Sequence, residues 1–199
     1  MVFKGFYHLL NHVFFIKNMK KTILLPFLVI IIFSSSIINN FAETMFKDNF
    51  QDPNKWEFIS DNVMGGVSIG KVQYQSDTAI LSGNVSTENN GGFIQIRMSL
   101  DKIKLDKAKS IKLIAKGNNQ KYFVHLRTTG TLLPWQYYQA EFIVEENFKE
   151  FILPIEDFKK SGSLMLKKVN PKKITSIGLV AYGRDHEAEL VIKEIEFIN

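Results

Sequence analysis

Apolar and polar side chains alternate along most of the chain after Met45. A period of about two residues places alternate side chains on opposite faces of a β-strand, whereas a helix requires a period of about 3.6. The runs with this alternation are 78–85, 93–98, 111–115, 122–126 and 138–144. They predict short strands, each with one face in a core and the other face outside it.

Two segments near the end of the chain depart from simple alternation. The run 176–182 is almost entirely apolar, which is typical of a strand buried on both faces. Farther on, the apolar phase shifts by one residue between Ile192 and Ile195, and this shift predicts a bulge near Lys193 and Glu194.

Glycine, asparagine, aspartate and proline separate these runs, as they do in turns between strands. Only Ile155–Lys160 is typical of a helical turn. Many short strands without an amphipathic helix predict an all-β fold, and specifically an antiparallel β-sandwich.

From Met19 the sequence has the pattern of a secretory signal. Two lysines precede the apolar run Ile23–Phe33, and small and polar residues then lead to Ala42. We expect cleavage after Ala42 and export to the periplasm or the cell exterior; the alternative is an uncleaved segment that anchors the protein in a membrane. A chain that begins at Met19 fits this signal pattern better than one that includes the upstream segment 1–18. The expected organisation is a leader over 1–42 and a single domain over 43–199.

The net charge of +5 does not indicate a nucleic-acid partner. Four of the 25 basic residues and none of the 20 acidic residues lie in 1–42, so residues 43–199 carry a formal charge of only +1. Phosphate recognition requires a concentrated basic face. The lysine-rich stretches 102–112 and 167–173 are interspersed with apolar residues, and we interpret them as solvated faces.

The segment 60–71 contains two letter patterns of functional loops. Its G-x-S-x-G match centres on Ser68, but a nucleophile elbow requires a helix after the serine, and the following residues predict a strand. Its resemblance to a phosphate-binding loop fails at Val72, where Ser or Thr is required. We interpret the segment as a turn into a strand, in which Gly65 and Gly66 supply positive φ or close backbone approach. Ser68→Ala is then expected to be mild.

No metal site, cofactor site or catalytic constellation is predicted. The absence of cysteine excludes disulfides and thiolate chemistry, and beyond the leader only His125 and His186 are histidines, far apart in the sequence. The carboxylates are scattered, although a glycosidase pair can come from distant strands, and spacing alone leaves that alternative open. We expect no enzymatic activity and no cofactor.

Polar and aromatic residues occupy the outer phase of several predicted strands. If these strands are neighbours, their side chains converge on one face of a sheet, where arginines offer multidentate donors and aromatic rings offer stacking surfaces. An ordinary solvated face is the alternative. The candidate ligand- or partner-binding residues are Gln95, Arg97, His125, Arg127, Trp135, Tyr137 and Gln139.

Two sequence blocks, DNVMGGVS at 61–68 and ENNGGF at 88–93, together resemble the complex I intermediate-associated protein 30 (CIA30) family. The resemblance covers roughly 46–198 and is also carried by Arg97, Arg127 and the segment 138–142. The signature residues are Asp61, Asn62, Met64, Gly65, Gly66, Asn89, Asn90, Gly91, Gly92 and Phe93.

The resemblance implies a galactose-binding-like jelly-roll sandwich without catalytic activity. It also implies a chaperone-like assembly role for respiratory NADH dehydrogenase, with subunits of that complex as protein partners. Our leading hypothesis is therefore an exported binding module that acts through protein contacts. The alternative is a carbohydrate-binding module that uses the polar sheet face, with a glycan as its partner. In both cases a membrane contact is expected only through an uncleaved leader.

Overall fold

A computed structural model describes residues 42–199. The predicted secretory signal lies outside these residues, so the leader, its cleavage and the boundary at residue 42 stay predictions. Within 42–199 there is no helix of the length and apolar character needed to cross a membrane.

The described residues form twelve strands and five short 3-10 helices. The strands are β1 (Thr44–Asp48), β2 (Trp56–Ser60), β3 (Ile69–Gln75), β4 (Thr78–Val85), β5 (Phe93–Ser99), β6 (Ser110–Gly117), β7 (Lys121–Thr128), β8 (Tyr138–Ile143), β9 (Lys149–Pro154), β10 (Lys159–Lys160), β11 (Ile174–Tyr182) and β12 (His186–Ile198). The 3-10 helices are η1 (Pro53–Lys55), η2 (Asp61–Met64), η3 (Glu88–Asn90), η4 (Ile155–Asp157) and η5 (Pro171–Lys173).

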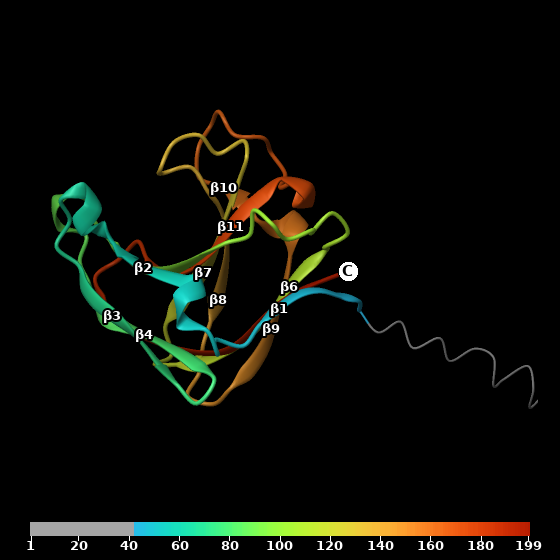
Figure 1. Ribbon diagram of the computed structural model, residues 1–199. Coiled ribbons are helices and arrows are strands. Elements are labelled where there is room, and N and C mark those ends of the chain that lie inside the picture. Colours follow the sequence, from blue (N-terminus) through green and yellow to red (C-terminus); the bar gives the residue numbers. More distant parts are fainter. Residues whose placement is uncertain (1–41) are drawn as a thin grey trace, which may run out of the picture. The chain divides into compact units, whose positions relative to one another are not determined.

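The strands form two six-stranded antiparallel sheets, which lie as two layers in Figure 1. One sheet has the order β3-β4-β12-β6-β9, and β1 pairs with the second half of β12. The other has the order β10-β8-β7-β11-β5-β2. This confirms the predicted all-β jelly-roll sandwich. The second sheet, which we call the cleft sheet, positions the candidate site.

Alternation along each strand divides its residues between the core and the outside. In β5 and β7 every second side chain is buried between the sheets, including Ile94 and Ile96 from β5 and Val124 and Leu126 from β7. The intervening side chains are only partly buried and lie on the outer face. A sheet of this kind packs one face into the core and leaves the other for solvent or a ligand.

The predicted irregularity in the last strand is confirmed. The pairing of β12 with β6 shifts register between Ile192 and Glu194, so that Leu190, Ile195 and Phe197 are all buried despite the change of phase. The extra residue allows one long strand to keep its apolar side chains in the core on both sides of the bulge.

The segment 176–182 is buried on both faces for a specific reason. β11 lies between β5 and β7 at the centre of the cleft sheet. Leu179 faces the core, while Gly178 and Val180 lie on the other face at the bottom of a cleft. The predicted helical turn near 155–160 is a single 3-10 turn, η4, followed by the short strand β10.

Candidate functional site

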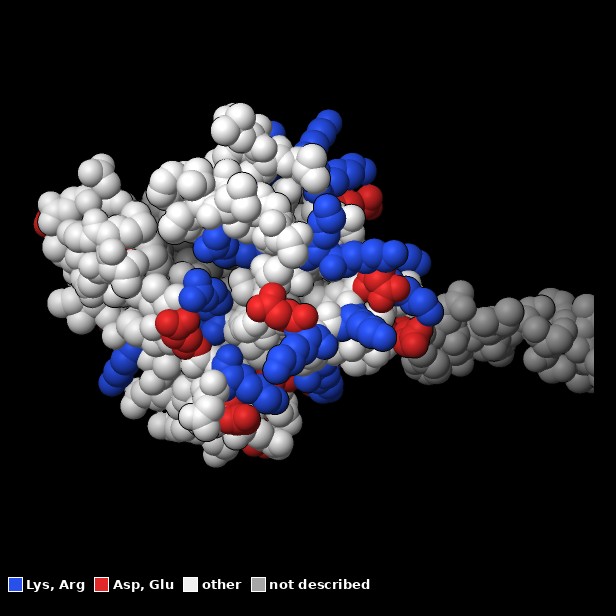
Figure 2. Space-filling view, turned by 45° about the horizontal axis from the view of Figure 1, so that its top comes forward, with Lys and Arg blue, Asp and Glu red and all other residues white. Residues whose placement is uncertain are grey.

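A cleft of about 430 Å³ lies on the outer face of the cleft sheet. Its floor comes from β5, β7 and β11, and its two walls come from the segment around η2 and η3 and from the loop between β7 and β8. Figure 2 shows this face as a hollow between two mostly uncharged surfaces, with basic side chains visible inside. The volume is within the range of small-molecule binding sites.

The structure brings six of the seven predicted site residues together along this cleft. The six that line it are Gln95, Arg97, His125, Arg127, Trp135 and Tyr137. The seventh, Gln139, pairs with His125 on the neighbouring strand but does not line the cleft. Strand order explains the convergence, because β5 and β7 flank β11, and β8 lies beside β7.

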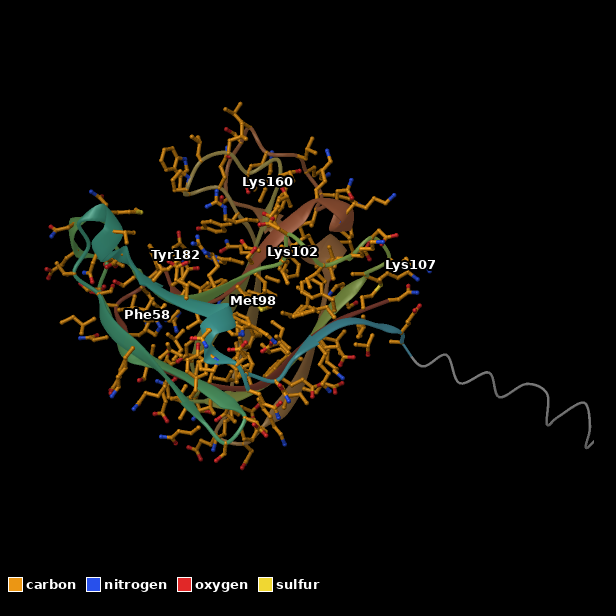
Figure 3. The ribbon with its side chains drawn as sticks, viewed as in Figure 1. Phe58, Met98, Lys102, Lys107, Lys160 and Tyr182 are labelled. Atoms are coloured by element: carbon orange, nitrogen blue, oxygen red, sulfur yellow. The ribbon has the colours of Figure 1, made fainter. Side chains whose placement is uncertain are left out.

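Sequence reasoning missed the contribution of β11. Ser176, Gly178 and Tyr182 share the outer phase of this strand and line the cleft. In Figure 3, Tyr182 lies on the opposite side of β2 from Phe58, which packs against the core. Ser176, Gly178 and Tyr182 share one phase of the strand, and this phase could have indicated a face outside the core. The other residues of the segment are almost all apolar, so the sequence pattern predicts that both faces lie in a core.

The cleft floor contains a stacked cluster of rings. His125 and Tyr137 lie parallel, with ring centroids 3.9 Å apart and an interplanar angle of 10°, and Tyr182 meets both rings edge-on. Burial lowers the pKa of His125 to about 3, against an opposing contribution from the Gln139 side chain. Burial, and then the hydrogen bond with Tyr182, raise the pKa of Tyr137. At neutral pH both rings are therefore uncharged.

The two arginines differ in how much of each guanidinium is committed to the protein. Arg97 donates from Nη2 to Glu57 at 2.8 Å, in a pair that is open to solvent. Arg127 donates from Nη2 to the carbonyl oxygens of Thr131 and Leu133, both at 3.1 Å. Burial, and then the charge of Arg97, lower the pKa of Arg127. Arg127 thus orders the β7–β8 loop in addition to lining the cleft.

The β7–β8 loop presents Trp135 as an open stacking surface. The Trp135 side chain is 62% exposed. Gln136 holds the loop in place, because its Oε1 accepts hydrogen bonds from the backbone N–H groups of Leu132 at 2.8 Å and Leu133 at 3.1 Å. Ser161 Oγ donates to the Trp135 carbonyl at 2.9 Å. These bonds hold the indole over the cleft without burying it.

The opposite wall is held by one buried carboxylate, Asp61, which is fully shielded from solvent. Its oxygens accept hydrogen bonds from the backbone N–H groups of Ser68 at 3.0 Å, Gly92 at 2.5 Å and Phe93 at 3.2 Å, and from Ser68 Oγ at 2.5 Å. Both signature blocks therefore meet at the same side chain. We call these residues the Asp61 cluster.

The glycines of the signature leave room for this carboxylate. Gly65 has a φ of 89°, and a Cβ on Gly66 or Gly91 would overlap the Asp61 side chain. Because the backbone packs directly against Asp61, η2 and η3 are held together and present Val63, Met64 and Asn90 to the cleft.

The Asp61 cluster also corrects the expectation for Ser68. Ser68 precedes β3, is fully buried, and accepts a hydrogen bond at Oγ from the Ser86 backbone N–H at 3.0 Å. Its hydroxyl thus joins Asp61 to the segment after β4, which the sequence pattern did not indicate.

We therefore expect Ser68→Ala to lower the free energy of unfolding by about 2 kcal/mol, since it removes one donor from Asp61 and leaves a buried N–H without its acceptor. Urea denaturation checks this value. Ser82→Ala, on the outer face of the other sheet, is the matched control and should change stability little. If Ser68→Ala is as stable as the control, the Ser68 hydroxyl contributes little to the stability of the fold.

The cleft lining contains no carboxylate. Glu57 and Asp101 lie farther along the same face, in a second, more open depression of about 450 Å³ that shares Arg97 and Arg127 with the cleft. Within residues 42–199, no group of three or more His, Asp or Glu side chains is arranged to hold a metal ion. The two depressions together form a groove that is aromatic at one end and polar at the other.

Comparison with protein families assigns the chain. The model of the family described as complex I intermediate-associated protein 30 (CIA30) matches residues 44–192. The chain belongs to the CIA30 family. The match includes both signature blocks and all the residues that line the cleft, so the Asp61 cluster and the cleft are parts of a CIA30 domain.

Solved structures confirm the fold of this CIA30 domain. The family 11 carbohydrate-binding module from Clostridium thermocellum, solved in complex with a β-1,3-1,4-mixed-linked tetrasaccharide, has a TM-score of 0.61 at 16% identity. The alignment covers 79% of this chain and 96% of that one. The family 11 module of a cellulosomal cellulase from the same organism has a TM-score of 0.60 at 14% identity, covering 80% of this chain and 95% of that one. Among curated proteins, no match is found.

Proposed function

We propose that this CIA30-family protein binds a saccharide chain in the cleft and does not hydrolyse it. The observation that carries the proposal is the combination of an exposed indole and two phenol rings with guanidinium and amide donors, in a cleft whose lining has no carboxylate.

The chemistry of the cleft suits a sugar ring. A pyranose has apolar C–H faces and hydroxyls around its edge, so it is bound well by an aromatic face combined with planar hydrogen-bond donors. Trp135 and Tyr182 line the cleft with aromatic rings, and Gln95 and Arg97 supply donors from β5 on its floor. The groove formed by the cleft and its polar extension gives room for more than one sugar unit.

The same residues favour binding over catalysis. Glycoside hydrolysis ordinarily requires two carboxyl groups that flank the scissile bond. The cleft offers neither, and the two carboxyl groups of the groove, Glu57 and Asp101, both lie in its polar extension, where Glu57 is paired with Arg97. The histidine of the cleft cannot accept a proton near neutral pH, because burial holds the pKa of His125 at about 3. Tyr137 is equally unsuited, since burial raises its pKa.

The fold supports this proposal without identifying a ligand. The chain shares the sandwich of family 11 modules, one of which was solved with a bound tetrasaccharide, but at 16% identity the likeness concerns architecture alone. The proposal therefore depends on the cleft residues of this chain.

Affinity electrophoresis of the full chain against a panel of soluble neutral and acidic polysaccharides tests the proposal. We expect at least one polysaccharide to retard the protein, and Trp135→Ala to weaken that binding about tenfold through loss of a stacking face. Phe148→Ala is the matched control, because Phe148 is a partly exposed ring outside the cleft lining. If no polysaccharide retards the wild-type protein, the proposal is wrong.

A second candidate is a chaperone-like role through protein contacts, which the family membership favours together with the exposed Val63 and Met64 beside the cleft. The level of assembled NADH dehydrogenase in the membranes of a deletion strain separates the two candidates. An unchanged level is expected if saccharide binding is the protein's role.

A further inference from the structure

Three leucines at one end of the sandwich are exposed to an extent unusual for apolar side chains. Leu164 is 91% exposed, Leu132 is 83% exposed and Leu166 is 68% exposed. Leu132 lies in the β7–β8 loop, and the other two lie in the loop between β10 and η5. Both loops lie at the top of Figure 1. None of the three leucines lines the cleft.

Specific contacts hold the two loops against each other. Ser161 Oγ donates to the Trp135 carbonyl at 2.9 Å, and the Tyr138 hydroxyl donates to the Leu166 carbonyl at 3.1 Å. Between the two exposed leucines of the second loop, Met165 is buried, with 6% of its surface exposed. The loops are thus anchored from inside while the leucines face outward.

The second loop lies within a strongly basic segment. Residues 159–173 contain six lysines and no acidic residue, and the β7–β8 loop 129–137 contains no charged residue. No salt bridge within residues 42–199 involves any of the six lysines. Lys160 is used internally, since its Nζ donates to the carbonyls of Ser163 at 2.8 Å and Met165 at 3.0 Å, and Figure 3 shows it at the base of the loops.

The remaining five are Lys159, Lys167, Lys168, Lys172 and Lys173, and all are exposed. Figure 2 shows an uncharged surface at this end with basic side chains beside it. The local charge of this segment contrasts with the near-neutral total of residues 43–199.

We propose that the two loops bind the surface of an anionic phospholipid membrane. The leucines would enter the boundary between headgroups and acyl chains, where removing their apolar surface from water lowers the free energy. The lysines would contact the anionic headgroups. Trp135 follows Leu132 and Leu133 in the same loop and is 62% exposed, and tryptophan is enriched at membrane interfaces. A purely polyanionic partner would use the lysines and leave the leucines in water, so the combination favours a lipid surface.

The two tryptophans allow the binding site itself to be observed. Trp56 is 5% exposed in the core, whereas Trp135 lies in the proposed membrane-binding loop. The full chain also contains the apolar run 23–33, so membrane capture alone does not identify the loops. Quenching of tryptophan emission by brominated acyl chains does identify them, because only a residue at the bilayer boundary is reached.

The experiment mixes the full chain with vesicles of equimolar phosphatidylglycerol and phosphatidylcholine, or of phosphatidylcholine alone. In a Trp56→Phe background, we expect the anionic vesicles to shift the fluorescence emission of Trp135 to shorter wavelength. Anionic vesicles with brominated acyl chains should also quench this emission. The triple variant Leu132→Ser, Leu164→Ser, Leu166→Ser should weaken the response about tenfold. Replacement of Lys167, Lys168, Lys172 and Lys173 by glutamine should remove its dependence on phosphatidylglycerol.

Ile69→Ser is the matched control, because Ile69 is 75% exposed on the edge strand β3 of the other sheet. Vesicle binding without Trp135 quenching would assign membrane contact to the leader and overturn the proposal. A triple variant that binds as well as wild type would overturn it too. So would lysine-dependent binding of heparin in the absence of any Trp135 response to vesicles, which would indicate a soluble polyanion. Saccharide binding in the cleft is judged separately, because it should be weakened in Trp135→Ala and kept in the lysine replacements, none of which lies in the cleft lining.

Discussion

Asp61→Ala is expected to lower the free energy of unfolding by about 4 kcal/mol. Asp61 is fully buried and accepts four hydrogen bonds from Ser68, Gly92 and Phe93. Its removal leaves buried donors without an acceptor, and each such donor costs about 1–3 kcal/mol. The alanine would also leave a space among the signature glycines that pack on the carboxylate. Urea denaturation followed by tryptophan fluorescence measures the loss.

Asp106→Ala is the control for this change, since Asp106 is exposed. Asp61→Asn should destabilise the fold nearly as much as Asp61→Ala. Its amide nitrogen is a donor and would face an N–H group whose hydrogen bond the carboxylate now accepts. An Asp61→Ala protein within about 1 kcal/mol of wild type would mean that the Asp61 cluster does not hold the two signature blocks together.

The same site predicts a direction for the pH dependence of stability. Burial by itself would raise the pKa of Asp61, but hydrogen bonds from Gly92, Ser68 and Phe93 outweigh it and leave the pKa below the ordinary value of 3.8. The ionised carboxylate therefore stabilises the fold fully at pH values above 3.8, and this contribution is lost as the pH falls through the lowered pKa. The stability difference between wild type and Asp61→Asn should accordingly be constant near neutral pH and shrink in acid.

Gly178→Leu is expected to abolish saccharide binding, with a loss of affinity of at least about a hundredfold, or about 2.7 kcal/mol. Gly178 lies at the bottom of the cleft, and its missing side chain makes the cleft deep. A Cβ there would come within 2.9 Å of Gln95 Oε1, the end of a side chain that can move aside. The added leucine would then fill the space proposed for the sugar ring.

Folding should tolerate this change, because the backbone of Gly178 lies in a regular strand and its Cβ would point away from the core. Affinity electrophoresis with the polysaccharide that binds wild type measures the loss, and thermal unfolding checks that the variant is folded. Ser82→Leu places the same side chain on the outer face of the other sheet and should bind normally. A folded Gly178→Leu protein with wild-type affinity would show that the saccharide binds elsewhere.

Part of the site was accessible from sequence because strand geometry is local. Alternation in 93–98 and 122–126 assigned Arg97 and His125 to an outer face, since a period of two fixes the face of each side chain within its own strand. The bulge in β12 was predictable for the same reason, as its apolar side chains must return to the core. The two signature blocks likewise indicated the family before any contact between them was known.

Strand order, by contrast, is a property of the whole chain. Only the placement of β11 between β5 and β7 shows that Gly178 and Tyr182 face a cleft and not a second core. Asp61 and Gly92 are likewise brought into contact only when β2 pairs with β5. The sequence by itself determined the strands with clear alternation, the faces of their side chains and the family, but it did not indicate β1, β2, β9 or β10. The tertiary structure decided which faces meet, because hydrogen-bonded pairing joins segments that are distant in the chain. The side-chain pattern within one strand does not show which other strand it pairs with.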